Sequence, residues 1–364
     1  GLSMWISTPA TALMMLPIGM AVIRQFKDKP KFAIALMLGI AYGASIGGIA
    51  TPIGTPPNIA FLGIYSRLYP SAPPIQFGQW MLFAFPLALV FLPLAWLVLV
   101  RKVEDDGGDA SATLEESIRD MGTALPIERR VFAMFVSTAL LWIFRQPIVL
   151  PFVTIPGWAA LVPGAVINDG VVAMTMGLLL FVLPAGGTDG RVALLDWQQV
   201  RRKMPWGILL LFGGGYALAD AIAGSGTAAW VGTQMGFMAG LTPLLLIILS
   251  GTLLTFMTEI TSNTATVQIM LPLAAAVAVG TIGVNPLIVM LPVTVAASFA
   301  FMLPVATPPN AVIFGSGAIP MSAMVRHGIW LNLIGIILLT LVCRWLAPFI
   351  FGIDLGGGVP DWAL

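Results

Sequence analysis

Residues 55–58 read Thr-Pro-Pro-Asn, and residues 307–310, 252 positions further on, read Thr-Pro-Pro-Asn again. Both copies lie inside long apolar stretches. Proline lacks a backbone N–H and its ring clashes with the preceding turn, so a proline pair ends one helix and allows another to start. The sequence therefore predicts two apolar helices that are each interrupted part-way along.

A second pair of segments repeats at nearly the same distance. Residues 7–11 read Ser-Thr-Pro-Ala-Thr and residues 262–266 read Ser-Asn-Thr-Ala-Thr, an offset of 255. The apolar stretch around the second copy is too long for one membrane crossing. The polar residues 258–264 interrupt it, which predicts a hairpin of two short helices over 243–280 with a polar tip. The second interrupted helix is expected over 286–318.

The composition places the chain in a membrane. Of its 364 residues, 58% are hydrophobic and 9% are charged, whereas soluble domains carry about 25% charged residues. This excludes a cytosolic enzyme, a secreted disulfide scaffold and a disordered chain. A net charge of +1 gives no basic surface for nucleic acid, and one Cys with one His excludes thiolate and His-rich metal sites in this sequence.

Loop charges orient the spans. Seven further apolar segments are candidate spans: 32–50, 80–100, 131–144, 171–185, 206–223, 287–305 and 329–350. Assigning sides by alternation, with both hairpins returning to their own side, puts 14 of the 17 Lys and Arg on one side, which the positive-inside rule makes cytoplasmic. The two hairpins then enter from opposite sides. We therefore expect an all-α polytopic membrane protein with two re-entrant hairpins and two unwound transmembrane helices. Its inverted-topology repeat is typical of secondary transporters.

The repeat divides the chain into three parts. We expect residues 1–100 to form the first repeat and residues 131–364 the second. Residues 101–130 carry 13 of the 33 charges and are expected to be a cytoplasmic linker. The chain is apolar from Gly1 and has no charged leader, so we expect an N-terminal truncation, with further membrane segments preceding Gly1.

Four polar interruptions therefore converge on one chemical interpretation. The polar tips offer free backbone N–H groups and the positive ends of helix dipoles to an anion. The unwound stretches offer carbonyls and hydroxyls to a small cation such as Na⁺. No Lys or Arg lies in any of these segments. An anion bound there needs co-bound cations, which predicts ion-coupled transport.

Several motifs resemble one family. They are Leu-Ser-Met-Trp-Ile-Ser at 2–7, Thr-Glu-Ile-Thr-Ser-Asn-Thr-Ala-Thr at 258–266, both Thr-Pro-Pro-Asn copies, and Gly-Gly-Gly at 213–215 followed by Leu-Ala at 218–219. Together they resemble the divalent anion/sodium symporter family, the di- and tricarboxylate transporters. The resemblance implies that the chain is not an enzyme but an elevator-type symporter or exchanger. It also implies a multi-pass homodimer in the bacterial inner membrane. It implies dianionic substrates such as succinate, malate, fumarate or citrate, co-transported Na⁺ and no organic cofactor.

The resemblance also implies a set of binding residues. The first sodium site maps to Ser3, Ser7, Thr8 and Gly54. The second maps to Thr258, Thr261, Asn263 and Ala306. Substrate carboxylates map to Ser7, Thr8, Thr55, Pro56, Ser262, Asn263, Thr264, Thr307 and Pro308.

One departure from the family pattern leaves alternatives open. The family has Ser-Asn-Thr at both tips, whereas the first tip here reads Ser7-Thr8-Pro9. Thr8 lacks the amide group, and Pro9 lacks both a hydroxyl and an N–H. A sodium-independent dicarboxylate exchanger and a sulfate or other oxyanion transporter are therefore alternatives within transport. A membrane enzyme or a non-transporting scaffold is the alternative outside it, and the sequence has no hydrolase motif to support an enzyme.

Single residues carry further expectations. Glu259 is either an acid that attracts a cation or a partner for backbone N–H groups of the tip, and we favour the second because a negative charge beside an anionic substrate opposes binding. Asp220 is expected at a wet, external helix end, and Asp169 at an interfacial helix start.

Three more features have structural interpretations. His327 is expected in a cytoplasmic loop with no catalytic or metal role. Residues 213–215 are expected to allow close helix packing or a flexible joint. Residues 188–204 predict an interfacial amphipathic helix.

Overall fold

The computed structural model describes residues 1–26, 29–101, 103, 123, 125–149, 154–162, 167–185, 193–204, 206–234, 236 and 240–364. The chain forms two compact units. Unit one comprises Gly1–Ile75, Trp80–Gly108 and Leu210–Leu364, and unit two comprises Gln76–Gln79 and Asp109–Leu209.

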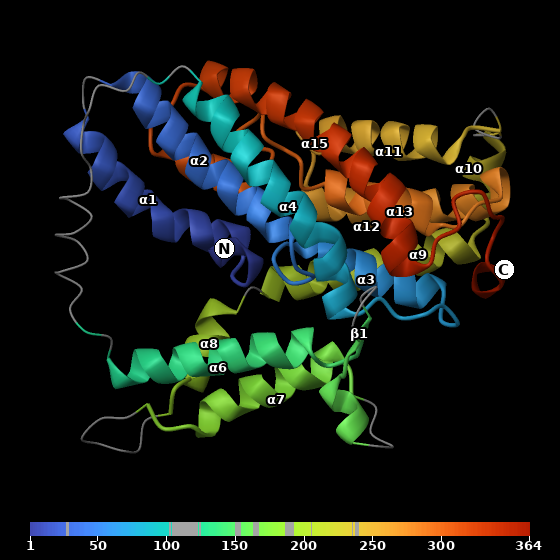
Figure 1. Cartoon of the computed structure of the whole chain (residues 1–364), viewed down its shortest axis with the longest axis horizontal. Helices are drawn as coiled ribbons and strands as arrows, with labels where there is room; N and C mark the ends of the chain where they lie inside the picture. The colour runs from blue at the N-terminus through green and yellow to red at the C-terminus, as the bar shows by residue number, and fades with distance from the viewer. Residues whose placement is uncertain are drawn as a thin grey trace. The chain divides into compact units, whose positions relative to one another are not determined.

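Unit one is helical and holds both copies of the repeat (Figure 1). In chain order its elements are η1 (Leu2–Met4), α1 (Thr8–Gln25), α2 (Pro30–Ile49), α3 (Pro56–Leu68), α4 (Phe77–Val100), α9 (Trp206–Gly224), α10 (Thr227–Gln234), α11 (Pro243–Met257), α12 (Asn263–Val277), the π-helical turn η4 (Ala278–Ile282), α13 (Leu287–Ala296), α14 (Pro308–Gly315), α15 (Met321–Phe351) and η5 (Asp361–Ala363). The first residues of α4 and α9 belong to unit two.

Five helical segments of the described chain are long and apolar enough to cross a membrane. They are Pro30–Ile49, Phe77–Val100, Trp206–Gly224, Asn263–Ile282 and Met321–Phe351. α15 has a large apolar outward face. Its side chains Trp330, Ile337 and Trp345 are exposed, while Asn332 and Leu339 are buried. An apolar outward face suits lipid.

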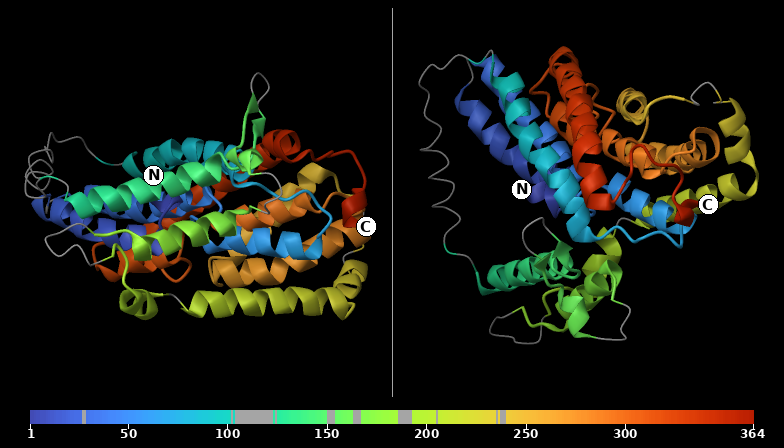
Figure 2. Two further views of the ribbon diagram at one scale, coloured as in Figure 1. Left: turned by 90° about the horizontal axis from the view of Figure 1, so that it is seen from below. Right: turned by 45° about the vertical axis from the view of Figure 1, so that its right-hand side comes forward.

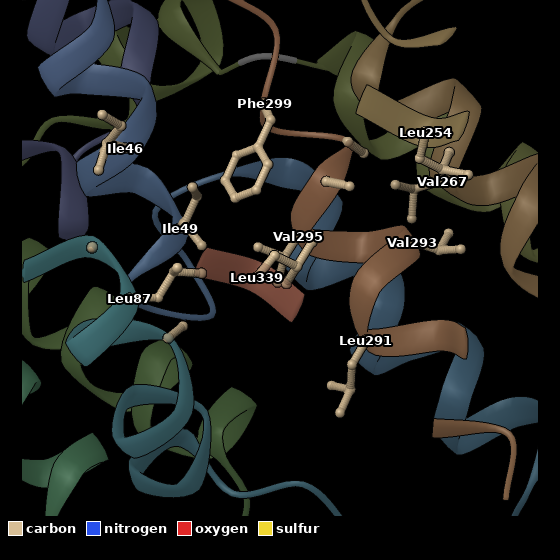
Figure 3. Close-up of a cluster of buried hydrophobic side chains, with 14 of the residues drawn as sticks. Ile46, Ile49, Leu87, Leu254, Val267, Leu291, Val293, Val295, Phe299 and Leu339 are labelled. Atoms are coloured by element: carbon tan, nitrogen blue, oxygen red, sulfur yellow. The ribbon is translucent and has the colours of Figure 1, made fainter. Parts of the chain in front are cut away.

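The core of unit one is built by close helix packing. α2, α4 and α15 run side by side (Figures 1 and 2). A Cβ added at Gly335 of α15 would lie 2.9 Å from the ring of Phe299 and 3.2 Å from that of Phe91, so glycine is needed for this approach. Figure 3 shows Ile46 and Ile49 of α2 in the same buried cluster as Phe299. Segments of both repeat copies therefore share one core.

Unit two contains shorter elements. They are α6 (Pro126–Ile143), β1 (Ile148–Val149), β2 (Thr154–Ile155), η2 (Trp158–Leu161), α7 (Asp169–Val182) and α8 (Trp197–Lys203). Arg145, which is 7% exposed, joins them from the end of α6: it donates to Asp169 at 2.6 Å, to the Ile167 carbonyl at 2.9 Å and to Gln76 at 2.6 Å. A buried guanidinium with these partners fixes the start of α7.

Four expectations about elements are corrected. The chain is not entirely α-helical, because β1 and β2 pair antiparallel. The expected span 287–305 is helical only over α13, and the segment after it bonds to side chains instead. His327 lies inside α15 rather than in a loop, since residues 321–327 contain no Pro or Gly to delay that helix.

The expected amphipathic helix 188–204 is also shorter. It begins at Trp197, where Asp196 caps the backbone N–H of Gln199 at 3.3 Å. Residues 188–192 of that prediction, and most of the expected linker 101–130, namely 102, 104–122 and 124, lie outside the described residues.

Candidate functional site

Two helix breaks and two tips make up the candidate site. The first break, residues 50–55, separates α2 from α3. The second break, residues 297–307, separates α13 from α14. The first tip, residues 3–9, precedes and starts α1, and the second tip, residues 258–264, joins α11 to α12. All four lie in unit one.

The carbonyls of the first break are satisfied by two side chains. Asn58, fully buried on the first turn of α3, donates from Nδ2 to the carbonyls of Thr51 at 2.8 Å, Ile49 at 3.2 Å and Gly48 at 3.5 Å. Trp80 donates from Nε1 to the same Ile49 carbonyl at 3.0 Å. These carbonyls lie at the end of α2, where no helical N–H can reach them.

The second break has the same arrangement. Asn310, fully buried on the first turn of α14, donates from Nδ2 to the carbonyls of Ala300 and Leu303, each at 3.0 Å. Asn310 lies 252 residues after Asn58, and its two acceptors lie 252 residues after two of the acceptors of Asn58. In both amides Oδ1 has no hydrogen-bond partner within the described structure. The two breaks are thus built by equivalent contacts.

The first tip packs directly on the first break. A Cβ at Gly54 would collide with the carbonyl oxygens of Gly48 and Ser3, and one at Gly47 would collide with the hydroxyl of Ser3. A Cβ at Gly48 would lie 2.5 Å from Cγ2 of Thr8. Ser3, Thr8 and Gly54, three residues of the expected first sodium site, are therefore brought together.

The second tip is linked to the second break by hydrogen bonds. The Thr258 hydroxyl lies 2.6 Å from Oδ1 of Asn263 and 2.9 Å from the carbonyl oxygen of Ala297. The hydroxyls of Thr261 and Thr266 lie 2.7 Å apart. Thr258 and Asn263, two residues of the expected second sodium site, are in contact.

The remaining expected ligands lie at helix starts. Thr307 is buried and caps α14 by accepting from the N–H of Asn310 at 3.4 Å. Ala306 is buried in the second break just before it. Ser7 precedes α1, Thr55 precedes α3 and Ser262 precedes α12, and in the described structure none of these three side chains caps its own helix. Their hydroxyl groups are thus not committed to the helix starts.

Helix packing interlocks the two repeat copies. α1, which starts at the first tip, packs against α14, which follows the second break, and α12 packs in turn against α3. Each tip helix therefore contacts the helix after the other copy's break. Within the described chain, however, no hydrogen bond joins the first tip to the second.

The expected substrate residues are uncharged and partly accessible. Of the expected substrate residues, Ser7, Ser262 and Pro308 are exposed and Pro56 and Asn263 half-buried, whereas the other four, Thr8, Thr55, Thr264 and Thr307, are buried. None of them is basic. The positive ends of four helix dipoles supply the positive potential instead, since the first turns of α3 and α14 begin with two prolines each and offer no free N–H group there.

A cavity of about 630 Å³ lies beside the first tip, between α1, α2 and α4. Its lining is mainly apolar, and Ser3 is the only expected ligand residue that it contains. This cavity therefore does not coincide with the expected substrate-binding residues.

Glu259 forms different contacts from those expected. Its carboxylate does not bond the tip's own N–H groups. Instead it accepts from the N–H groups of Phe301, Met302 and Leu303 at 2.8, 2.9 and 3.0 Å, all in the second break. It also accepts from Nδ2 of Asn332 at 2.8 Å. Glu259 does bond backbone N–H groups, as expected, but these groups belong to the second break and not to the tip.

Other expectations have clear outcomes. Asp220 is half-exposed and pairs with Arg67 at 2.5 and 2.6 Å. At the start of α7 the cap is Asn168, which accepts from Val171, while Asp169 pairs with Arg145. His327 bonds through Nδ1 to its own helix, at the Ala323 carbonyl.

The glycine run 213–215 is close-packed at one position. A Cβ at Gly215 would collide with the side chain of Gln268, which donates to the Leu211 carbonyl at 3.0 Å. Neighbouring Gly213 and Gly214 have open space around them in the described structure.

The comparisons with known proteins match this architecture. The family model described as the sodium:sulfate symporter transmembrane region matches residues 2–353. The chain belongs to the sodium:sulfate symporter family. It is 38% identical, over 99% of its length and 69% of theirs, to proteins named sodium-dependent dicarboxylate transporter SdcS from Staphylococcus aureus strains RF122, MSSA476 and COL. The resemblance found in the motifs is thereby confirmed.

Membership in the sodium:sulfate symporter family decides the class of protein. The chain is a multi-pass membrane transporter, and the alternatives of an enzyme and a non-transporting scaffold are excluded. Its helical architecture and apolar spans agree with a transmembrane region.

Sequence reasoning missed several residues at the two breaks of the candidate site. Pro52 and Pro304 lie three residues before the two Thr-Pro-Pro-Asn copies, and their shared offset of 252 was a detectable signal. The hydrogen bonds of Asn58 and Asn310 were also missed, although both residues belong to the motif. Trp80 had no signal, because nothing in a single apolar span marks the indole as a donor to a distant break.

Proposed function

We propose that this chain is a Na⁺-coupled transporter of C4-dicarboxylates such as succinate, malate and fumarate, or of related di- and tricarboxylates such as citrate. The observation that carries the proposal is the matched pair of breaks, in which Asn58 and Asn310 bond equivalent carbonyls just before two equivalent helix starts. The relatives named as sodium-dependent dicarboxylate transporters support the substrate class.

The substrate is proposed to bind through helix starts. One carboxylate would meet Ser7, Thr8, Thr55 and Pro56, and the other would meet Ser262, Asn263, Thr264, Thr307 and Pro308. Hydroxyl groups and the positive ends of four helix dipoles, together with the backbone N–H groups at the start of α12, stabilise negative charge without a basic side chain. The absence of a basic side chain among these residues favours a substrate whose charge is balanced by cations that enter with it.

Sodium is proposed to be co-transported cargo at two sites. Ser3, Ser7, Thr8 and Gly54 would hold one ion, and Thr258, Thr261, Asn263 and Ala306 the other. The close approach of Ser3, Thr8 and Gly54, and the contact of Thr258 with Asn263, support this grouping. Hydroxyl, amide and carbonyl oxygens are hard ligands that suit Na⁺.

The transport cycle is proposed to be an elevator in a homodimer with two re-entrant hairpins. Its support is the division of the chain, since unit one holds both tips and both breaks and unit two holds none of them. The inverted repeat is supported by the interlocked packing of α1 with α14 and of α12 with α3.

The membrane orientation is proposed from the basic residues, with the membrane being the bacterial inner membrane. Lys31 and Arg326, both assigned to the cytoplasm, line one cavity of about 350 Å³ together with His327. The first turns of α2 and α15, far apart in sequence, thus lie together, which agrees with the positive-inside assignment.

The test is uptake of labelled succinate by the full chain in liposomes, with a Na⁺ gradient and with choline replacing Na⁺. The proposal expects accumulation only with the Na⁺ gradient. An absence of uptake and counterflow for every di- and tricarboxylate would contradict the substrate class.

Sodium-independent exchange is the second candidate, and the first tip favours it. Pro9 sits in the first turn of α1 and offers no N–H there, and Thr8 offers no amide. Counterflow of succinate in choline would support this candidate. Inhibition of succinate uptake by equimolar sulfate would point instead to an oxyanion transporter.

A further inference from the structure

Glu259 is a buried carboxylate for which the proposed transport cycle has no role as a ligand. Its side chain is 3% exposed and lies between the second tip and the second break. Burying an ionised carboxylate is costly unless hydrogen bonds replace its hydration. The contacts of Glu259 are therefore the first clue to what it does.

The carboxylate accepts four hydrogen bonds, which are shared unequally between its two oxygens. Oε1 accepts from the N–H groups of Phe301 and Met302 and from Nδ2 of Asn332, and Oε2 accepts from the N–H of Leu303. An ionised carboxylate has about four lone-pair sites. Oε2 keeps one unused site, but the side chain is 3% exposed and surrounded by four donors, so the geometry favours a supporting role for Glu259 over direct ligation.

The three backbone donors lack any helical acceptor. α13 ends at Ala296, so residues 301–303 fall outside a helical ladder. The carbonyls of Ala300 and Leu303 are taken by Asn310. Glu259 binds the N–H groups and Asn310 the carbonyls, so two side chains together define the conformation of this unwound segment.

α15 packs very closely against the same unwound segment. A Cβ at Gly328 would collide with the Phe301 carbonyl group and would lie 2.7 Å from Cα of Met302. Asn332, one helical turn later and fully buried, donates to Glu259. α15 can approach the break this closely only because residue 328 has no side chain.

Glu259 also connects two halves of the expected second sodium site. Thr258, beside it, contacts Asn263 at the tip, and Ala306 follows the residues whose N–H groups Glu259 holds. We propose that Glu259 is a positioning residue that sets the distance between the second tip and the second break, and with it the affinity of the second sodium site. The inference rests on the proposed function, because it gives a structural cause for the Na⁺ affinity of the proposed transporter.

The test compares Glu259→Gln with the wild-type chain in liposomes. Glutamine keeps the length of the side chain but turns an NH₂ group toward N–H donors, so the break loses up to half of its acceptors. Since hydrogen bonds to charged groups are strong, we expect the Na⁺ concentration for half-maximal succinate uptake to rise by about tenfold or more. The succinate concentration for half-maximal uptake at saturating Na⁺ should change by less than about threefold, because the substrate groups remain.

Two controls separate positioning from folding. Glu128→Gln makes the same chemical change at an exposed carboxylate that caps α6, and its Na⁺ dependence should match the wild type. Asn332→Ala removes one donor and leaves the carboxylate, so it should raise the half-saturating Na⁺ concentration less than Glu259→Gln does. Size-exclusion profiles and melting temperatures measure the folded fraction of every variant.

Each outcome either supports or overturns the inference. A folded Glu259→Gln variant whose half-saturating Na⁺ concentration stays within about twofold of the wild type would overturn it. Should that variant not fold, Asn332→Ala replaces it as the test variant, and an unchanged Na⁺ dependence overturns the inference. If the wild-type chain itself shows no Na⁺-dependent uptake, the proposed function is contradicted. The inference, which depends on that function, is then overturned as well.

Discussion

The two breaks of this chain share one motif but end their helices differently. In the first copy α2 remains helical to Ile49, whereas in the second α13 stops at Ala296, five residues earlier in the repeat frame. The first copy thus satisfies its backbone N–H groups inside the helix, and the second satisfies them with Glu259. The carbonyl side is the same in both, because Asn58 and Asn310 occupy equivalent positions.

This difference teaches that a repeat can preserve the geometry of a site while changing what supports it. The first break depends on uncharged groups, namely Asn58, the indole of Trp80 and the hydroxyl of Thr51, which donates to the Met4 carbonyl. The second break depends on a buried carboxylate. Mutations at matched positions should therefore act alike where the copies agree and differently where they do not.

The largest effect is expected from the shared amides. Asn58→Leu leaves the Gly48 carbonyl without a donor, and Asn310→Leu does the same to the equivalent Ala300 carbonyl. Each also removes one or two further hydrogen bonds, so the cost should be about 2–3 kcal/mol of folding free energy. Both variants should lose succinate uptake and melt at lower temperature by similar amounts. A stable, active variant at only one of the two positions would break the equivalence of the copies.

The next effect is expected at the second tip. Asn263→Ala removes a half-buried amide that contacts Thr258, and it should lower uptake by about 100-fold through lost cation and substrate contacts worth about 3 kcal/mol. Because the residue is not in the core, the melting temperature should stay close to that of the wild type. Full uptake by this variant would make the second tip purely structural.

A smaller effect is expected from Trp80→Phe, which removes the indole N–H that the Ile49 carbonyl accepts. Asn58 still donates to that carbonyl, so the loss should be about 1 kcal/mol in unfolding free energy. Chemical denaturation in detergent measures it, and the Na⁺ dependence of uptake should be nearly unchanged. A change in Na⁺ affinity as large as that of Glu259→Gln would mean that both breaks are equally sensitive to their supports.

The smallest effect is expected from Thr8→Asn, which gives the first tip the residue found at the second. The added amide oxygen lies beside Gly48 and Gly54, and it should lower the half-saturating Na⁺ concentration by about threefold, less than 1 kcal/mol. Na⁺ titrations of succinate uptake check this. A rise in that concentration would show that the close packing of Thr8 on Gly48 leaves no room for an amide.

Much of the site was predictable because it depends on local chemistry. Proline pairs stop helices wherever they occur, and Ser, Thr and Asn before an apolar run start them. Matching offsets of 252 and 255 then pair the segments without any knowledge of distance. The positions of α3, α12 and α14 follow from these local rules.

Other features depended on partners far away in sequence. The carboxylate of Glu259 meets N–H groups more than forty residues later and an amide from α15, and no local pattern marks them. The early end of α13 likewise followed from these contacts, since an apolar run such as 287–305 otherwise favours a continuous helix. The strands β1 and β2 are two residues each and too short to carry a periodic signal.

The amino-acid sequence alone determined that this is a membrane transporter with a duplicated, interrupted architecture, because apolar length, loop charge and proline placement act locally and repeat. Only the tertiary structure decided which groups hold each interruption open and which helices of one copy lie against the other. Those contacts join segments that are far apart in the sequence. Hydrogen bonds of about 3 Å between such segments produce no recognisable local pattern along the chain.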